Sequence, residues 1–474
     1  MKKIYSILTL LAAVAGFTSC SNDELSENNE SNTNKVIVYA TTNAASRSTL
    51  SNDYNVLWSM GDQIKFVNDK NDAVTYTFTL KEGAESTEGI FELNDGQDVP
   101  ADGSYTVYYP VSYDGTNWPT QSYVSATDIS GAPMKATATV SKGSITNLHF
   151  TNEGGILRYT VKGSKTLKSI NVKAASLDVT LDCGTGVALS SDGVVFNIAV
   201  PASEYSNAIL TFKASDNTIA SKFASTLKVT KNKISLVTFG AAALSFRPAG
   251  TLPGKFKVGD DKYVYFSKGN LYYDGTNYCF EENQYDAYNV AWDEKHVSRF
   301  YWQTDAANAR TFDKPSGRGG TSGILFTNST ATTANSGFTA NGQTGIWRAM
   351  DYTEADYLIK NHSIQDVYVN DIQGLVIAPF GSEVTVDMDY HYTAAEWAVA
   401  EAKGFLFLPA AGYVEGTSEV VTCFNIDGSY WLSNMETRQT SETVKSIFFS
   451  PTNPHIENLK YYRRSSIRLV TDCE

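Results

Sequence analysis

The stretch Thr75-Tyr-Thr-Phe-Thr-Leu80 alternates polar and apolar side chains residue by residue. This alternation predicts a β-strand with one face buried and the other in water. Similar short runs recur between Lys35 and Phe246 and are separated by Gly, Asn, Asp and Ser, the residues typical of turns. Further examples are Lys35–Tyr39, Gln63–Val67, Ser104–Tyr109, Leu157–Val161, Ser169–Val172 and Val194–Ile198. This part of the chain is therefore expected to fold as antiparallel β-sandwiches, without a long amphipathic helix.

A break in the pattern near Gly143–Asn147 divides this segment in two. There, a stretch rich in Ser, Thr and Ala gives way to a new series of predicted strands. We place a first sandwich at residues 35–145 and a second at residues 146–246. The chain of 474 residues is long enough for several domains, each with its own core.

The composition narrows the class of protein. With 42% hydrophobic and only 19% charged residues, most of the chain is predicted to be folded rather than disordered or coiled coil. The 51 acidic residues outnumber the 38 basic ones, so the formal net charge is -13. Binding to a phosphate backbone is electrostatically unfavourable at this charge, and nucleic acid is not an expected partner.

The first twenty residues have the features of a secretory signal. Two lysines precede an apolar stretch that is too short to span a bilayer, and the segment ends in Gly16-Phe-Thr-Ser-Cys20. This ending resembles a bacterial lipobox, which implies a signal peptide at residues 1–19 and a diacylated Cys20. The alternative is a plain cleavage site with an accidental cysteine.

An acidic segment at residues 20–34 follows the signal. It contains Asp23, Glu24, Glu27 and Glu30 and almost no apolar side chains, so it is expected to be a solvated tether. Acidic residues directly behind a lipidated cysteine resemble the surface-export signal of Bacteroidetes lipoproteins. The resemblance implies a location on the extracellular face of the cell outer membrane.

Four motifs in order carry a family resemblance. They are Arg47-Ser-Thr49, Trp58-Ser-Met-Gly-Asp62, Ser104–Pro110 and Leu148–Asn152, the last leading into the predicted strand Leu157–Val161. This succession resembles the fimbrillin-like (Mfa-like) family of surface lipoproteins over roughly residues 35–245. The resemblance implies two transthyretin-like β-sandwiches. Read by itself, Trp58 is equally typical of a buried aromatic residue before a strand.

The resemblance also implies a mechanism of assembly into a pilus. A trypsin-like protease cuts after an arginine near the start of the first domain, the severed strand leaves, and a strand of another subunit fills the groove. Here the candidate strand is Lys35–Thr41 and the candidate processing site is Arg47, the only basic residue between Lys35 and Lys65. The alternative is that Arg47 is an ordinary loop arginine and the strand stays in place.

The last part of the chain, residues 250–474, has a different sequence pattern. Asp351–Lys360 has apolar side chains at helical spacing, and Thr393-Ala-Ala-Glu396 is a capping box that opens an Ala-rich helix ending at Gly404. Few helices among many short strands predict an α+β domain. The segments that carry this pattern follow one another in the order Gly254–Val258, Val264–Asn270, Phe280–Gln284, Gly345–Arg348, Gly374–Ile377, Gly404–Gly412, Gly428–Ser433 and Ser465–Val470.

This set resembles the major paralogous domain of Bacteroidetes and Fibrobacteres surface proteins, which is similar to the C-type-lectin-like fold. In such a fold Trp347, Trp431 and Arg468 are expected in the core. Signatures of calcium and sugar binding are not visible in the sequence. Exposed aromatic side chains suit sugar faces or protein partners, and the ligand-binding candidates are Tyr390, Tyr392 and Tyr413. These tyrosines could equally cover the edge of the domain.

The sequence contains few residues in patterns typical of metal binding or catalysis. Asp387-x-Asp389-x-His391 is the best metal candidate, but it sits in a Tyr-rich loop without a second cluster, so we predict no metal site and no cofactor. The four cysteines left after lipidation, Cys183, Cys279, Cys423 and Cys473, are too widely spaced for a metal pair. They are expected to be buried or free thiols, with one bridge among the last three left open. No catalytic motif occurs, and an enzyme is not expected.

The sequence therefore predicts a cell-surface adhesin. It is expected to be a pilus tip subunit that accepts a donor strand, presents a lectin-like domain to a glycan or protein ligand, and resides in the fimbrium once processed. The tip assignment rests on the folded domain after Phe246, which leaves no free strand to donate. The alternatives are a lipid-anchored surface glycan-binding protein for nutrient capture and, as a third class, a carbohydrate-active enzyme with a carboxylate pair.

Overall fold

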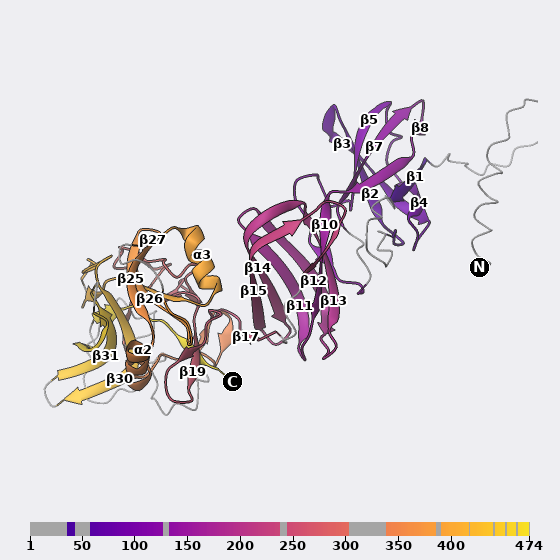
Figure 1. Ribbon diagram of the computed structural model, residues 1–474. Helices are drawn as coiled ribbons and strands as arrows, with labels where there is room; N and C mark the ends of the chain where they lie inside the picture. The colour runs from indigo at the N-terminus through magenta and orange to yellow at the C-terminus, as the bar shows by residue number, and fades with distance from the viewer. Residues whose placement is uncertain are drawn as a thin grey trace, which may run out of the picture.

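The computed structural model describes residues 36–42, 57–126, 132–237, 244–302, 338–384, 390–416, 418–438, 441–450, 453–460 and 463–473. These residues are mainly β, as the sequence predicts. Figure 1 shows three β-rich bodies that follow one another along the chain. We call them the first, second and third body.

The first body is one eight-stranded sheet in the order β5-β2-β3-β4-β1-β9-β7-β8. Because β5 also pairs with β7, this sheet closes on itself instead of forming the two stacked sheets expected of a sandwich. Its core is filled by the inward side chains of the strands, including Phe66, Phe78 and Phe150. The strands are β1 (Ile37–Thr42), β2 (Gln63–Asn68), β3 (Asn71–Glu82), β4 (Glu88–Leu93), β5 (Gly103–Tyr109), β7 (Met134–Ser141), β8 (Ser144–Ile145) and β9 (Leu148–Asn152).

The second body consists of two sheets over a shared core. Leu157 and Tyr159 of one sheet pack in the same cluster as Ile170 and Val172 of the other. The smaller sheet has the order β13-β10-β16 and the larger β17-β15-β14-β11-β12-β6. Their strands are β6 (Gln121–Ser122), β10 (Gly154–Val161), β11 (Thr166–Ala174), β12 (Leu177–Ala188), β13 (Val194–Pro201), β14 (Ser203–Ala214), β15 (Thr218–Val229), β16 (Ile234–Val237) and β17 (Arg247–Pro248).

The chain passes between these two bodies more than once. β9 pairs with β1 and β7, so the first sheet runs to Asn152, beyond the boundary expected near residue 145. The short strand β6, in contrast, pairs with β12 of the second body although it precedes β7 in sequence. The alternation of polar and apolar residues indicates which face of a strand is buried. It does not indicate which of the two bodies the strand joins.

The third body contains five small sheets of three or four strands each among its described residues. Their orders are β18-β19-β34, β20-β21-β23-β24, β22-β33-β29, β27-β25-β26-β28 and β30-β31-β32. The strands are β18 (Phe256–Lys257), β19 (Tyr263–Phe266), β20 (Leu271–Tyr273), β21 (Tyr278–Phe280), β22 (Phe300–Tyr301), β23 (Thr339–Ala340), β24 (Gln343–Thr344), β25 (Ile364–Val369), β26 (Ile372–Ile377), β27 (His391–Tyr392), β28 (Leu406–Pro409), β29 (Val414–Glu415), β30 (Gly428–Arg438), β31 (Ser441–Phe449), β32 (His455–Lys460), β33 (Arg463–Ser465) and β34 (Val470–Asp472).

The helices of the third body begin at capping boxes. Helix α2 (Tyr352–Asn361) has Asp351 as its N-cap, with Glu354 completing the box. Helix α3 (Ala394–Ala402) begins after Thr393 and uses Glu396 in the same way, which confirms the capping box predicted from the sequence. Gly404 adopts a positive φ of 96° just beyond this helix, a conformation that glycine tolerates best.

The core of the third body contains large aromatic side chains and a buried arginine. Trp347, Trp431 and Arg468 are buried, as predicted. The Arg468 guanidinium donates to the Asn270 side-chain oxygen (3.0 Å) and to the Phe407 carbonyl (2.8 Å). Burial lowers the pKa of Arg468 to about 10, so at neutral pH it still carries its charge and joins segments far apart in sequence.

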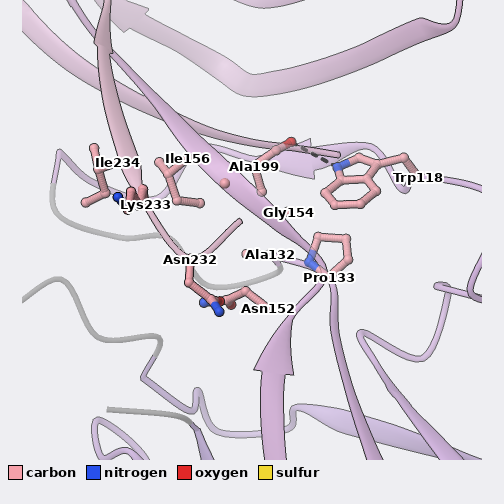
Figure 2. A pocket seen from close by; sticks show the side chains of 11 residues that line it. Trp118, Ala132, Pro133, Asn152, Gly154, Ile156, Ala199, Asn232, Lys233 and Ile234 are labelled. Atoms are coloured by element: carbon pink, nitrogen blue, oxygen red, sulfur yellow. Dashed lines mark hydrogen bonds between the residues drawn. The ribbon is translucent and has the colours of Figure 1, made fainter. Parts of the chain in front are cut away.

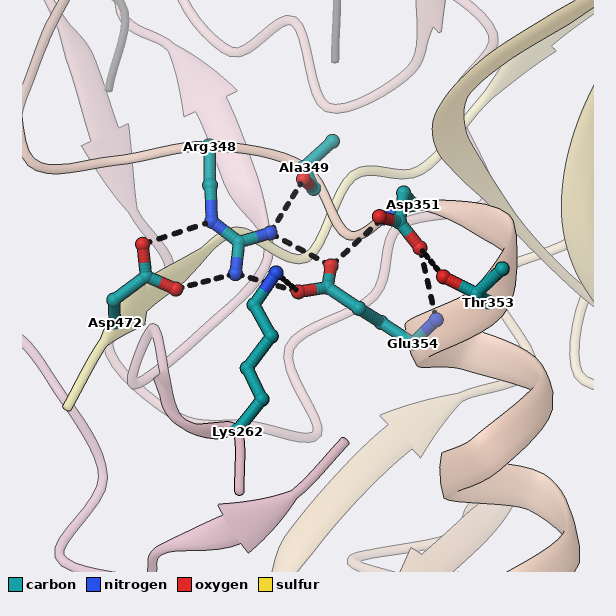
Figure 3. Close-up of polar contacts among 7 residues, drawn as sticks. All are labelled: Lys262, Arg348, Ala349, Asp351, Thr353, Glu354 and Asp472. Atoms are coloured by element: carbon teal, nitrogen blue, oxygen red, sulfur yellow. Dashed lines mark hydrogen bonds and ion pairs between the residues drawn. The ribbon is translucent and has the colours of Figure 1, made fainter. Parts of the chain in front are cut away.

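An ion-pair network attaches β34 to helix α2 (Figure 3). The Arg348 guanidinium contacts both carboxylate oxygens of Glu354 at 2.7 Å and the Asp472 carboxylate at 2.5 Å. Lys262 reaches the same Glu354 at 2.5 Å, and the Glu354 side chain is almost fully buried. Burial alone would lower the pKa of Arg348, but the hydrogen bonds that its guanidinium donates to Glu354 and Asp472 raise it above the ordinary value.

The described cysteines do not form disulfides with one another. Cys183, Cys279, Cys423 and Cys473 are all free thiols, so the bridge left open among the last three is not formed. Burial raises the pKa of Cys183 and of Cys473 to about 11, which keeps both thiols protonated at neutral pH. Within these residues, we find no helix with the length and hydropathy needed to cross a bilayer.

Candidate functional site

The first strand, β1, contributes one row of side chains to the core of the first body. Val38, Ala40 and Thr42 are buried, whereas Ile37 and Tyr39 are 44% and 47% exposed. This alternation follows the two-residue period of a strand. We call the space that β1 occupies between β4 and β9 its seat. The inward side chains of Val38, Ala40 and Thr42 fill this seat, whereas apolar side chains on the other face lie in solvent.

Both edges of β1 are paired. It runs antiparallel to β4, with Ala40 opposite Gly89, and parallel to β9, with Ala40 opposite Leu148. The Thr42 amide donates to the Thr87 carbonyl at 2.8 Å, and at the other end the Leu93 amide donates to the Val36 carbonyl at 2.9 Å. Without β1, the facing edges of β4 and β9 would lose these bonds, and unpaired edges are templates for another strand.

The floor of this seat is aromatic. The Trp58 ring packs edge to face against Phe91 at 4.9 Å and Phe150 at 5.5 Å between centroids. Trp58 is 1% exposed, so it is the buried aromatic residue that the sequence allowed for. Such rings supply a large apolar surface, which any strand lying in the seat would cover with its inward row.

A polar contact lies on the outer side of the β1–β9 seam. The Thr41 hydroxyl oxygen is 2.9 Å from Nδ1 of His149 and also donates to the Leu148 carbonyl at 3.3 Å. Sequence reasoning missed this pair, since it joins residues 108 positions apart.

The predicted processing and lipidation sites fall outside the described residues. Cys20 lies in the segment before residue 36, and Arg47 lies between residues 43 and 56. Both stay predictions. The described residue nearest to Arg47 on its N-terminal side is Thr42, the last residue of β1.

The structure brings two of the three predicted ligand-binding tyrosines together. The rings of Tyr390 and Tyr392 meet edge to face at 4.5 Å, and Tyr392 also packs against Trp397 of α3 at 5.7 Å. Tyr392 is half-buried, and burial raises the pKa of its hydroxyl. The neighbouring His391 stacks on Tyr368 at 4.4 Å with nearly parallel rings. These side chains form an aromatic group beside α3.

Tyr413 has other neighbours. It precedes β29, and the Arg463 guanidinium lies over its ring at 4.3 Å. The same arginine forms an ion pair with Glu415 at 2.6 Å. Burial raises the pKa of Tyr413, while the nearby Arg463 charge acts in the opposite direction. Its ring face is therefore already covered by a cation.

The metal candidate is described only in part. Asp387 and Asp389 lie outside the described residues, and His391 is engaged in the stack on Tyr368. Within the described ranges, no group of three or more His, Cys, Asp or Glu side chains is arranged to hold a metal ion.

One acid–base pair in the third body had no sequence signal. His296 Nε2 lies 2.7 Å from Oε1 of the buried Glu281, and its ring stacks on Tyr272 at 4.3 Å. The Tyr288 ring packs against the His296 ring edge to face, with 4.4 Å between their centroids. The hydrogen bond to Glu281 raises the pKa of His296, and burial raises the pKa of Glu281. This pair holds the loop after β21 against β20.

Comparisons with known proteins place no family name on the chain. No known family profile matches it, and no curated protein matches it either. Solved structures that are similar include a candidate cell adhesion protein from Bacteroides ovatus, with 13% identity, a TM-score of 0.28, and coverage of 45% of this chain and 95% of that one. A fimbrial protein from the same species has 10% identity, a TM-score of 0.24, and coverage of 93% and 99%.

The tip fimbrial protein Mfa3 from Porphyromonas gingivalis is also among them. It shows 10% identity and a TM-score of 0.21, over 44% of this chain and 98% of that one. The similar structures are thus fimbrial and candidate cell adhesion proteins. At TM-scores of this size, none of these likenesses defines the fold of the chain.

Proposed function

We propose that this protein is a cell-surface adhesin subunit whose β1 is exchanged for a strand of another subunit. Cleavage after Arg47 frees β1 from the rest of the chain, and the incoming strand takes its place between β4 and β9. The same cut separates the first body from the lipid on Cys20. In this proposal the cut therefore prepares the chain for assembly and also releases it from its lipid anchor.

The seat of β1 is the observation that carries the proposal. The strand is six residues long and its inward row consists of Val38, Ala40 and Thr42, which are small or medium in size. Its loss would uncover the aromatic floor around Trp58 and two strand edges. An incoming strand gains both the main-chain bonds and the apolar burial, and this is the energetic basis of strand addition.

The place at a pilus tip is supported by the last described strand. β34 pairs with β19, and Asp472 is bound by Arg348. This strand is committed to its own body and is not available to another subunit. In this proposal the chain accepts a strand, and the third body presents a lectin-like surface to a glycan or protein ligand, with Tyr390 and Tyr392 as contact candidates.

The test is limited trypsin digestion of the full chain, followed by intact mass and N-terminal sequencing. We expect one early cut, after Arg47, and a main fragment that begins at Ser48. The matched control is Arg47→Ala, which should delay the early cut while leaving the later digestion pattern unchanged.

Two outcomes would contradict the proposal. One is an uncut Arg47 under conditions in which trypsin cleaves after lysines and arginines elsewhere in the chain. The other is protein taken from its native surface that still begins at an acylated Cys20 in assembled form. Either result favours the lipid-anchored glycan-binding protein, since that function needs no loss of β1.

A further inference from the structure

A pocket lies where the first body meets the second (Figure 2). We call it the junction pocket, and its empty volume, open solvent included, is about 380 Å³. Residues of both bodies line it, because the chain crosses between them at Pro133 and again at Gly154. The pocket thus stands at the end of β9, the strand that pairs with β1.

The walls of the junction pocket are mostly apolar. Trp118, Pro133, Ile156 and Ile234 line it, and the indole nitrogen of Trp118 is already bonded to the Ala199 carbonyl at 2.9 Å. Three polar residues, Asn152, Asn232 and Lys233, also line the pocket. Of these, Asn152 has a buried side-chain oxygen without a hydrogen-bond partner. A buried acceptor left unpaired is costly, so this site favours an apolar group that carries one hydrogen-bond donor.

A strand in the position of β1 that continued along the same edge would run towards the pocket. β9 and β10 are separated only by Glu153 and form one run, in which β1 is parallel to β9 and β16 is parallel to β10. The Glu153 amide donates to Pro133 on one edge at 2.9 Å, whereas the Ile156 amide donates to Lys233 on the other at 2.9 Å. Successive strand residues face opposite edges, so β1 and β16 lie along the same edge of this run.

The register identifies the side chain that would reach the pocket. Thr42 lies opposite Phe150, and the inward row of β1 advances by two residues at a time. The next inward position, two residues further along a strand in this register, therefore lies opposite Asn152. Beyond it the strand meets the turn before β16, where the Asn232 amide donates to the Gly154 carbonyl at 3.0 Å.

We propose that the junction pocket receives one side chain of the strand that replaces β1, a proposal that rests on the strand exchange proposed above. The partner is an extended strand of a second protein. Its residue opposite Asn152 is aromatic and carries a donor, as tyrosine and tryptophan do. This side chain fixes the register, because a slip by one residue would turn it to the other face.

The test uses the full chain cut with trypsin after Arg47 and three fluorescent peptides. Each peptide has the sequence Val36–Thr42, then asparagine, then tyrosine, phenylalanine or alanine. We expect binding in the order tyrosine, phenylalanine, alanine, with at least about a tenfold difference in Kd between the tyrosine and alanine peptides. A fourth peptide, with tyrosine before the asparagine, carries the ring on the other face and should bind like the alanine peptide.

Variants of the chain assign the effect to the pocket. Asn152→Leu should abolish the preference for tyrosine over phenylalanine but keep that of phenylalanine over alanine. Thr151→Ala changes the adjacent residue on the opposite face and should leave all preferences unchanged. Thermal unfolding of each variant shows that the fold is retained.

The outcomes separate the two proposals. Equal binding of all four peptides would overturn the junction pocket as a socket while strand exchange stands. Binding of none of them, with β1 retained after the cut, would overturn both.

Discussion

Ala40 of β1 lies directly opposite Gly89 of β4, and Ala40 belongs to the same buried core as Trp58. A Cβ on residue 89 would come within 2.7 Å of Leu80 Cδ1 and 3.0 Å of Trp58 Cδ1. The small residue at each of these two positions leaves the space that the aromatic floor occupies. The space that β1 fills therefore depends on the small residue at position 89 of the neighbouring strand β4.

Gly89→Val should destabilise the first body. The added side chain has to displace Leu80 or Trp58 in a filled core, and overpacking of this kind costs about 1–3 kcal/mol. Urea unfolding followed by tryptophan fluorescence measures the loss. Gly259→Ala is the control, since its Cβ would meet only Lys262 at 3.3 Å. Equal stabilities of Gly89→Val and the native chain would show that the seat is not tightly packed.

The ion pair between Arg348 and Glu354 should contribute strongly to the stability of the third body. Glu354→Gln replaces the carboxylate that pairs with the charges of Arg348 and Lys262 by a neutral amide. Breaking a buried ion pair costs about 3–5 kcal/mol. The midpoint of urea unfolding is the measurement. Lys360→Ala is a matched control within the same helix, because its ion pair with Asp356 is exposed and its loss should change the midpoint little.

Stability should also depend on pH through His296. Its pKa is raised above the ordinary value of 6.5 by Glu281, so the folded state binds the proton more tightly than the unfolded state does. The stabilisation is complete below pH 6.5 and is lost as the pH rises through the raised pKa of the folded protein.

The comparison is between the native chain and His296→Gln, which keeps a donor for Glu281 but does not titrate. The advantage of the native chain in unfolding free energy should be largest near pH 6 and should shrink towards pH 8.5. An advantage that grows with pH would contradict the assignment of the ion pair.

Much of the secondary structure follows from local sequence. The alternation in Gln63–Val67 and Ser104–Tyr109 corresponds to β2 and β5, and the capping box at Thr393 to α3. These signals are local, because a strand's faces and a helix's first turn are set by residues a few positions apart. The burial of Trp347 and Trp431 follows from their size and apolar character.

The tertiary relationships had no such signal. The pairing of β5 with β7 closes the first sheet through main-chain hydrogen bonds. Almost every residue type can form such bonds, so the sequence does not indicate which strands pair. His296 and Glu281 are joined across a loop, and the junction pocket gathers Trp118, Asn152 and Ile234 from three distant segments. Single polar residues look alike in sequence, so only the fold distinguishes Asn152, at the end of β9, from other asparagines.

The central claim, that β1 leaves its seat, is tested most directly by a reversible lock. Tyr39 and Ile90 face each other across β1 and β4. The bonds at Thr42–Thr87 and Val36–Leu93 place them in a pair without mutual hydrogen bonds, where side chains are closest. A Tyr39→Cys, Ile90→Cys double variant can therefore tie the strand to β4 with a disulfide.

The measurement is uptake of a fluorescent Val36–Thr42 peptide by this variant after trypsin cleavage, oxidised and then reduced. Strand exchange predicts no uptake in the oxidised form and uptake like that of the native chain after reduction, with the native chain itself unaffected by the reductant. Uptake by the oxidised form, or none by the reduced form and the native chain, would contradict the claim that β1 gives up its seat to another strand.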